Sequence, residues 1–357
     1  MDKAILDAVA SGAYIMGKPV KELEAQLAEY VGVKHCLTCA NGTDALTLAL
    51  KAWGIGTGDA VFVPDFTFFS SAEVVPLEGA TPVFVDVCED TFNIDATDLQ
   101  RAVEQVLAEG RLRPRVVVAV DLFGLPADYK AIRQVADKYG LLILEDGAQG
   151  FGGSIDRKRA CSFGDIATTS FFPAKPVGCY GDGGAVFTDN DEWAALIESY
   201  RVHGKGTFKY DNVRIGLNSR LDTVQAAVLQ IKLKAFAENE LDAVNAAADK
   251  YTAILKDVVA TPVIPDGFRS SLAQYTIRLK DEAQRDALQA SLKAAGIPSM
   301  VYYPKPMHLQ TAFRAEPRNL CPVATSLCGC VLSLPMHPYI TDEDITTVAN
   351  AIISALK

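Results

Sequence analysis

A single lysine lies between two strand-like segments and beside a group of closely spaced glycines. Residues 166–172 have the composition of a buried strand, Lys175 follows, and an apolar run at 185–188 comes after four glycines within 178–184. This pattern predicts a lysine on a loop between two buried strands. Burial disfavours the charged ammonium, which lowers its pKa and lets the amine act as a carbonyl nucleophile or proton carrier. A solvated lysine beside a turn is the alternative.

A pair of carboxylates upstream favours the chemical interpretation. Apolar residues 141–144 are followed directly by Glu145 and Asp146. We expect a buried parallel strand here, and open α/β sheets bind their ligands at the carboxyl ends of such strands. A carboxylate at that position can pair with a ring nitrogen of a cofactor whose aldehyde reacts with Lys175. This combination of lysine and aspartate is what proteins contribute to pyridoxal phosphate chemistry.

Two further segments could serve such a cofactor. Asn41, Gly42 and Thr43 open a predicted helix, where free backbone N–H groups and the helix dipole attract anions. An ordinary N-cap explains the same residues equally well. Phe68 follows a predicted strand and could stack on a flat ring, although such phenylalanines are more often part of a core.

Strands and helices alternate through the first half of the chain. Apolar runs predict strands at 34–39, 61–65, 82–87, 115–123 and 141–146. Helical spacing predicts helices at 20–31, 41–53, 72–77, 97–108 and 129–139. This alternation predicts an α/β fold with a mostly parallel sheet between helices. No G-x-G-x-x-G follows an early strand and opens a helix, which argues against a nicotinamide dinucleotide site.

The second half has a different pattern, and 357 residues exceed the usual size of a single core. After a long helical stretch that ends near residue 255, we expect a strand at 274–279 and a strand-like segment at 299–303. Helices are expected at 286–296 and 342–356. We therefore predict a large cofactor-binding α/β domain at 1–235 and a small C-terminal α+β domain at 236–357.

Composition narrows the class of protein. The net charge of −10 argues against nucleic acid as a partner, and no apolar run approaches membrane-spanning length. The first residues lack a signal-peptide pattern, so we expect a cytoplasmic protein without a membrane partner. Cysteines at 36 and 39 and at 328 and 330 lack the spacing and nearby histidines of a zinc site, and we expect no metal.

Six motifs, in order along nearly the whole chain, resemble the DegT/StrS-type nucleotide-sugar aminotransferases, which are pyridoxal phosphate enzymes of the aspartate-aminotransferase fold (fold type I). The motifs are N-G-T-D-A-L at 41–46, P-D-F-T-F at 64–68, E-D-G-A-Q at 145–149, S-F-F-P-A-K at 170–175, G-D-G-G-A at 181–185 and N-S-R-L-D at 218–222. Each motif is modest by itself, but six in the same order are specific. Some relatives are dehydratases that have histidine at the lysine position, and Lys175 argues against that branch.

The resemblance implies a role for individual residues. Lys175 and Asp146 would be catalytic, Lys175 by binding the cofactor aldehyde and Asp146 by bonding the protonated pyridine nitrogen. The resemblance implies that the remaining cofactor contacts come from Gly42, Thr43, Phe68, Gln149, Ser170 and Asn218. Of these, Asn218 would complete the phosphate site of a neighbouring subunit, so the resemblance implies a homodimer with shared active sites.

Within the family, the segments around Lys175 and Asn218 look most like enzymes that aminate carbon 3 of UDP-2-acetamido-2-deoxy-3-keto-glucuronic acid, for bacterial surface polysaccharide. L-Glutamate is the expected amino donor. Arg220 is the candidate ligand for the sugar carboxylate, with an ion pair at the dimer interface as the alternative. Tyr302, Tyr303 and His308 are further substrate-binding candidates, although His308 could be an ordinary loop histidine.

Other functions stay open at this point. The acceptor could be a 3-keto or 4-keto hexose carried on dTDP, GDP or UDP. A non-catalytic regulator that binds pyridoxal phosphate or a sugar could share the same fold, since fold alone does not decide function.

Overall fold

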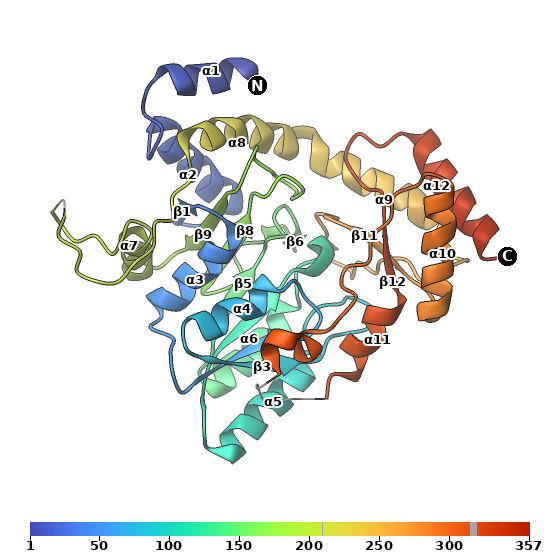
Figure 1. Ribbon diagram of the computed structural model, residues 1–357, viewed down its shortest axis with the longest axis horizontal. Helices are drawn as coiled ribbons and strands as arrows, with labels where there is room; N and C mark the ends of the chain where they lie inside the picture. Colours follow the sequence, from blue (N-terminus) through green and yellow to red (C-terminus); the bar gives the residue numbers. More distant parts are fainter. Residues whose placement is uncertain (209, 315–319) are drawn as a thin grey trace.

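The computed structural model describes residues 1–208, 210–314 and 320–357. At its centre is a seven-stranded sheet with the order β1-β9-β8-β5-β4-β2-β3 (Figure 1). The strands are β1 (His35–Cys39), β2 (Asp59–Pro64), β3 (Thr81–Val85), β4 (Arg113–Val120), β5 (Leu142–Asp146), β8 (Ile166–Ser170) and β9 (Gly184–Thr188). Only β9 runs antiparallel to its neighbours β8 and β1. The predicted mostly parallel sheet is confirmed.

Helices cover both faces of this sheet because successive strand residues point in opposite directions. In β2, Val61 and Val63 belong to one core cluster, and Ala60 and Phe62 belong to another. The first cluster includes residues of α3 (Gly42–Ala52), α4 (Ser70–Leu77) and α7 (Asp191–Tyr200). The second includes residues of α5 (Ala96–Glu109) and α6 (Tyr129–Tyr139). A sheet buried on both faces explains why its strands are almost continuously apolar.

The parallel strands end at one edge of the sheet. Asp146, the last residue of β5, pairs in register with Val120 of β4 and Thr168 of β8. Helix α3 begins just after β1, which runs in the same direction as β8. The loop that carries Lys175 connects β8 with β9 and therefore leaves the same edge. The topology thus gathers the predicted cofactor residues at one end of the sheet.

A second, smaller sheet lies in the C-terminal part of the chain. Strands β11 (Tyr275–Arg278) and β12 (Val331–Leu334) pair antiparallel. The helices of this part are α10 (Glu282–Ala294), α11 (Pro322–Cys330) and α12 (Asp342–Ala355), which follow the helical run of α8 (Thr223–Ala235), a π-helical segment (Phe236–Glu240) and α9 (Leu241–Leu255). Figure 1 shows α10 and α12 beside this sheet, at the far end of α9. The division at residues 235 and 236 stays a prediction.

The remaining elements are short or lie outside the central sheet. Helix α1 (Asp2–Ala10) packs against α8, and α2 (Lys18–Val31) packs against both α8 and β1. A three-stranded sheet consists of β6 (Ser154–Ile155), β7 (Lys158–Arg159) and β10 (Phe268–Arg269).

One predicted strand is wrong. Residues 299–303 form no strand, and only Met300 makes an isolated bridge, to Ser333 of β12. Beyond Met300 the chain leaves the small sheet and turns toward the carboxyl edge of the large one. Pro304 and Pro306, which lack an N–H group, follow directly and do not favour further pairing. The departure of this segment matters because Tyr302 and Tyr303 become part of the site.

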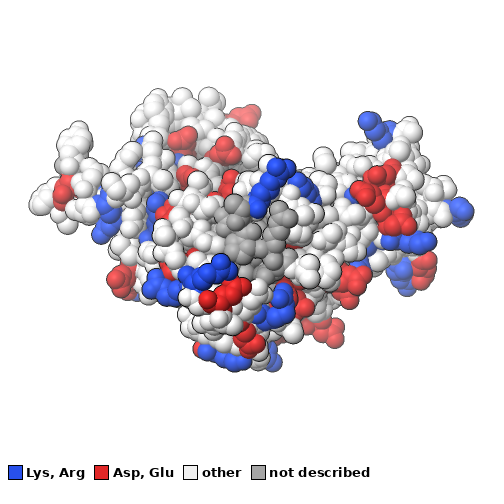
Figure 2. All heavy atoms as spheres, turned by 60° about the horizontal axis from the view of Figure 1, so that its bottom comes forward, with Lys and Arg blue, Asp and Glu red and all other residues white. Residues whose placement is uncertain are grey.

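Acidic and basic side chains are interspersed over the face shown in Figure 2. Among residues 1–208, 210–314 and 320–357, the helices include none with the length and apolar character needed to cross a bilayer. The described part of the chain also contains no group of three or more His, Cys, Asp or Glu side chains arranged to hold a metal ion.

Candidate active site

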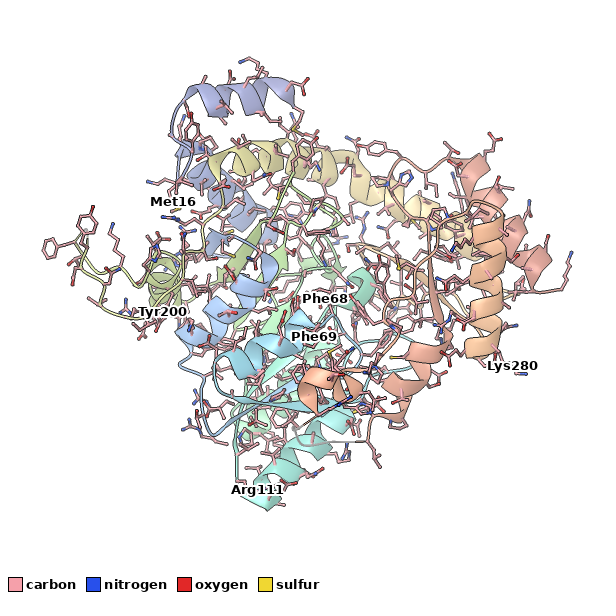
Figure 3. The ribbon with its side chains drawn as sticks, in the orientation of Figure 1. Met16, Phe68, Phe69, Arg111, Tyr200 and Lys280 are labelled. Atoms are coloured by element: carbon pink, nitrogen blue, oxygen red, sulfur yellow. The ribbon has the colours of Figure 1, made fainter. Side chains whose placement is uncertain are left out.

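A pocket of about 400 Å³ opens at the carboxyl edge of the large sheet. It brings together nine of the predicted site residues: Gly42, Thr43, Phe68, Asp146, Gln149, Ser170, Lys175, Tyr302 and Tyr303. Asn218, Arg220 and His308 are not among the residues that line it. Phe68 lies near the centre of the molecule in Figure 3, beside Phe69. The pocket therefore unites residues from both halves of the chain.

Lys175 is held on a compact turn. Its backbone N–H donates to the carbonyl of Phe172. The two ends of the loop are also joined, because the N–H of Phe171 donates to the carbonyl of Gly183 and the carbonyl of Phe171 accepts from the N–H of Cys179. Burial lowers the pKa of Lys175, and the negative charge of Asp146 opposes part of this shift. A buried amine with a lowered pKa has a larger neutral fraction, as a nucleophile or base requires.

Asp146 lies at the end of β5 with 5% of its surface exposed. Its Oδ2 accepts a hydrogen bond from the hydroxyl of Ser71 over 2.7 Å, and its Oδ1 accepts one from the backbone N–H of Ala148 over 3.2 Å. Burial raises the pKa of Asp146, while these two bonds and the charge of Lys175 lower it. A cationic ligand in the pocket would therefore stabilise the ionised carboxylate.

Glu145, the other carboxylate of the pair, has a structural role. Neighbouring residues of a strand point to opposite faces, so Glu145 turns away from the pocket. Its carboxylate accepts backbone hydrogen bonds from Cys161, Phe163 and Gly164. These bonds fix the chain that leads from the short hairpin into β8.

The start of α3 lies against the end of β8. A Cβ atom on Gly42 would lie 2.8 Å from Cβ of Ser170, so only glycine permits this approach. The hydroxyl of Thr43 is hydrogen-bonded to that of Ser70 over 2.8 Å. The side chain of Asn41 caps the helix by accepting from the N–H of Asp44. The predicted N-cap is confirmed, and hydroxyl groups surround the positive end of the helix, as an anion site requires.

Aromatic and amide side chains form another wall of the pocket. Oε1 of Gln149 accepts from the N–H of Phe123 over 2.6 Å, and its Nε2 donates to the hydroxyl of Tyr303 over 3.0 Å. The rings of Phe68 and Tyr303 lie 6.0 Å apart between centroids. Phe68 is 53% exposed and is therefore not simply part of a core.

Asn218 and Arg220 lie on the segment that leads into α8. Asn218 is exposed and forms an isolated bridge with Val202. Between them, Ser219 is buried, and its hydroxyl accepts a hydrogen bond from the N–H of Ala40 over 3.1 Å. The segment is thus attached close to the start of α3, and Asn218 does not line the pocket of its own chain.

His308 lies outside the pocket and is paired with Asp65. The imidazole Nδ1 is 2.5 Å from Oδ2 of Asp65, and the backbone N–H of His308 donates to Oδ1 over 2.7 Å. The side chains of His308 and Asp65 are 13% and 0% exposed.

Comparison with known proteins assigns the chain to a family. Residues 1–353 match the model of the DegT/DnrJ/EryC1/StrS aminotransferase family. The chain belongs to this family. The predicted resemblance is therefore confirmed.

Two curated relatives align along almost the whole chain. The UDP-2-acetamido-2-deoxy-3-oxo-D-glucuronate aminotransferase of Pseudomonas aeruginosa is 44% identical, with 99% of this chain and 95% of the relative aligned. The UDP-N-acetyl-3-dehydro-alpha-D-glucosamine 3-aminotransferase of Acidithiobacillus ferrooxidans is 40% identical, with 95% of this chain and 89% of the relative aligned.

Solved structures of the family have the same fold. A DegT/DnrJ/EryC1/StrS aminotransferase from Brucella abortus superimposes with a TM-score of 0.97 at 50% identity, over 99% of this chain and 95% of the other. NtdA from Bacillus subtilis, solved with bound cofactor PMP, gives a TM-score of 0.89 at 26% identity, over 99% and 81% of the two chains.

Sequence reasoning missed two residues of this site. Ser71 orients Asp146, and Ser70 is bonded to Thr43. The available signal was a pair of hydroxyl residues where a predicted strand passes into a helix, the place where short polar side chains serve as caps or ligand contacts.

Proposed function

We propose that this protein is a pyridoxal phosphate-dependent aminotransferase that moves an amino group from L-glutamate to carbon 3 of a UDP-bound 3-keto sugar. The observation that carries the proposal is that Lys175, with its lowered pKa, and the buried carboxylate of Asp146 line one pocket. Membership of an aminotransferase family and the names of the two curated relatives support the same reaction.

The pocket residues fit the cofactor. Lys175 would hold its aldehyde, Asp146 its ring nitrogen, and the start of α3 with Ser170 its phosphate. Burial raises the pKa of Asp146, and a protonated ring nitrogen supplies a positive charge that favours the ionised carboxylate. The amino form of the same cofactor, PMP, is bound in the Bacillus subtilis neighbour. When bound, pyridoxal phosphate supplies an electron-withdrawing ring that stabilises the negative charge left by removal of a proton from the substrate.

The residues of the pocket have different roles in the proposed reaction. With the cofactor bound, the neutral amine of Lys175 would take a proton from the carbon that gives up the amino group and deliver one to the carbon that receives it. The same amine would serve in both halves of the reaction. Ser71 and Ala148 hold the carboxylate of Asp146 in one orientation. Phe68 and Tyr303 line the pocket with neighbouring rings, and these apolar surfaces would limit the entry of water.

The acceptor we propose is UDP-2-acetamido-2-deoxy-3-keto-glucuronic acid, on the way to bacterial surface polysaccharide. We propose that the reaction takes place in the cytoplasm. The names of both curated relatives specify a UDP sugar with the oxo group at carbon 3, and the relative of higher identity names the glucuronate. Arg220 is the proposed ligand of the carboxylate at carbon 6, because a guanidinium binds a carboxylate through two parallel hydrogen bonds.

We propose further that the protein acts as a homodimer with shared active sites. Among the described residues that line the pocket, Lys175 is the only lysine or arginine, whereas the substrate carries a diphosphate and a carboxylate. Asn218 and Arg220 lie outside the pocket of their own chain. A second copy that presents these side chains would complete the phosphate site and the carboxylate site.

The first experiment follows the absorbance of the cofactor-loaded protein as L-glutamate is added without an acceptor. Amino transfer removes the visible band of the lysine-bound cofactor and produces the amino form, which absorbs at shorter wavelength. An unchanged band would argue against glutamate as the donor, and the absence of any band would argue against the role of Lys175.

A second experiment compares two acceptors that differ only at carbon 6, the 3-keto glucuronate and its neutral glucose counterpart, both carried on UDP. We expect the wild-type protein to have a higher kcat/KM for the uronate than for the neutral sugar. In Arg220→Met the ratio of these two kcat/KM values should fall by about tenfold or more. Equal use of both acceptors by the wild type would contradict the uronate assignment. Product formation without stoichiometric 2-oxoglutarate would indicate dehydration instead.

A further inference from the structure

The segment that carries Tyr302 and Tyr303 reaches the pocket from the small sheet. Met300 is bridged to Ser333 of β12, and seven residues later the chain begins a short 3-10 turn, Met307–Leu309. Between these two points lie the tyrosines that line the pocket. The position of this wall therefore depends on where both ends of the segment are attached.

The second end of this segment is attached to a single residue, Asp65, whose carboxylate is buried. Asp65 follows β2 directly, and its backbone carbonyl accepts from the N–H of Met307 over 2.8 Å. Its two carboxylate oxygens accept from the backbone and the Nδ1 of His308, over 2.7 and 2.5 Å. The N–H of Asp65 donates to Val85 of β3, which anchors it to the large sheet. We call the paired side chains of Asp65 and His308 the clamp.

The clamp joins the two chain segments that form the outer wall of the pocket, which are residues 67–68 and residues 302–303. Thr67 and Phe68, which line the pocket, come two and three residues after Asp65. On the other side, the ring of Tyr303 lies 6.0 Å from that of Phe68 and 6.2 Å from that of Phe66, and its hydroxyl is bonded to Gln149. A shift of the segment 302–308 would therefore displace Tyr303 relative to Phe68 and break its bond to Gln149.

We propose that His308 is a positioning residue whose bond to Asp65 holds the Tyr302–Tyr303 wall where the acceptor sugar nucleotide binds. The proposal rests on the proposed function. An amino-acid donor is small and reacts beside Lys175, whereas a sugar nucleotide is much larger and must contact more of the residues that line the pocket. Loss of the clamp should therefore weaken acceptor binding more than it slows the half-reaction with the donor.

Burial makes the clamp stronger than an exposed attachment between the same two parts of the chain. Arg278 of β11 is paired with Glu89 and Asp90, whose side chains are 71% and 66% exposed. Exposed ion pairs contribute little, whereas a buried carboxylate that loses its partner is strongly unfavourable. Glu89→Gln is accordingly the matched control, since it weakens an exposed connection and leaves the clamp intact.

The test uses three substitutions at His308. Asparagine places its Nδ2 at the same distance from the backbone as the imidazole Nδ1, so His308→Asn retains the donor to Asp65. His308→Gln carries its amide one atom further out and His308→Ala has none, so both lose that donor. The KM for the acceptor should rise about tenfold or more in the alanine and glutamine variants, and stay near the wild-type value in His308→Asn and Glu89→Gln.

Amide hydrogen exchange of the cofactor-loaded protein supplies a readout that needs no turnover. Exchange in segments 299–309 and 65–69 should accelerate in His308→Ala and His308→Gln and remain unchanged in His308→Asn. Unchanged exchange in His308→Ala would overturn the clamp. Accelerated exchange with equal losses in the donor and acceptor half-reactions would overturn its assignment to the acceptor. If the wild type transfers no amino group, the proposed function fails, and the exchange experiment still decides whether the clamp exists.

Discussion

Ser71 donates a hydrogen bond to Oδ2 of Asp146 over 2.7 Å, although the two residues are 75 positions apart in the sequence. Ser71 lies in the first turn of α4, and Asp146 is the last residue of β5. The bond therefore joins the helix that follows β2 to a strand two places away in the sheet. It orients the carboxylate in a buried site and opposes the rise in the pKa of Asp146 that burial causes.

Ser71→Ala should lower kcat by about tenfold to a hundredfold, because a hydrogen bond to a charged group contributes about 1.5–3 kcal/mol. Affinity for the cofactor should fall in the same variant, which a titration of the apoprotein with pyridoxal phosphate would measure. Ser162→Ala makes the same change at a serine that does not line the pocket and is expected to retain full activity. Equal kcat values in the two variants would contradict the orienting role of Ser71.

Asp146→Asn should maintain or raise the stability of the apoprotein while it lowers the activity of the cofactor-loaded protein. Because burial raises the pKa of Asp146, the folded apoprotein holds this proton more tightly than the unfolded chain does. The stability associated with this group is therefore greatest below its usual pKa and decreases as the pH rises through the raised value. At neutral pH the asparagine variant removes that unfavourable charge, so we expect thermal unfolding of the apoprotein at an equal or higher temperature than in the wild type.

Activity should move in the opposite direction in Asp146→Asn. A neutral amide does not favour a protonated ring nitrogen, and kcat should fall by at least about a hundredfold. Calorimetry of the apoprotein and steady-state kinetics of the loaded protein would measure the two effects. A large loss of apoprotein stability would contradict the argument from the raised pKa.

Gly184→Ala should weaken binding of the cofactor phosphate. A Cβ atom on Gly184 would lie 2.4 Å from the carbonyl oxygen of Asn41 and 2.9 Å from the nitrogen of Gly42. The start of α3 would have to move, and such overpacking costs about 1–3 kcal/mol, which corresponds to roughly tenfold to a hundredfold in affinity. Gly56→Ala is the control, since its nearest neighbour would be 3.6 Å away. Direct titration with pyridoxal phosphate would compare the two.

Mixing two inactive variants tests the shared active site. If Asn218 serves the neighbouring subunit, a dimer of one Lys175→Ala chain and one Asn218→Ala chain has one site with both residues intact. Random pairing should then restore about a quarter of the wild-type activity. If Asn218 acts within its own chain, every site in the mixture lacks one residue and no activity returns. Refolding the variants together and separately provides the comparison.

Local sequence patterns determined most of the secondary structure and the class of fold. The strand that ends in Glu145 and Asp146, the helix that begins at Gly42 and the loop that carries Lys175 were all recognisable from apolar periodicity, glycines and caps. These signals act over a few neighbouring residues, because burial and capping depend on what lies one face or one turn away. Motif order then identified the family without any knowledge of contacts.

The tertiary structure decided what these signals could not contain. Register and strand alternation determine that Asp146 enters the pocket while Glu145 binds backbone N–H groups on the opposite face. Packing brings Ser71 to Asp146 and pairs His308, a predicted substrate ligand, with Asp65. The segment 299–303, which has the composition of a strand, leaves the small sheet and supplies Tyr303 to the pocket. These outcomes depend on contacts between residues far apart in the sequence, and such contacts follow from how the sheets and helices pack, not from local composition.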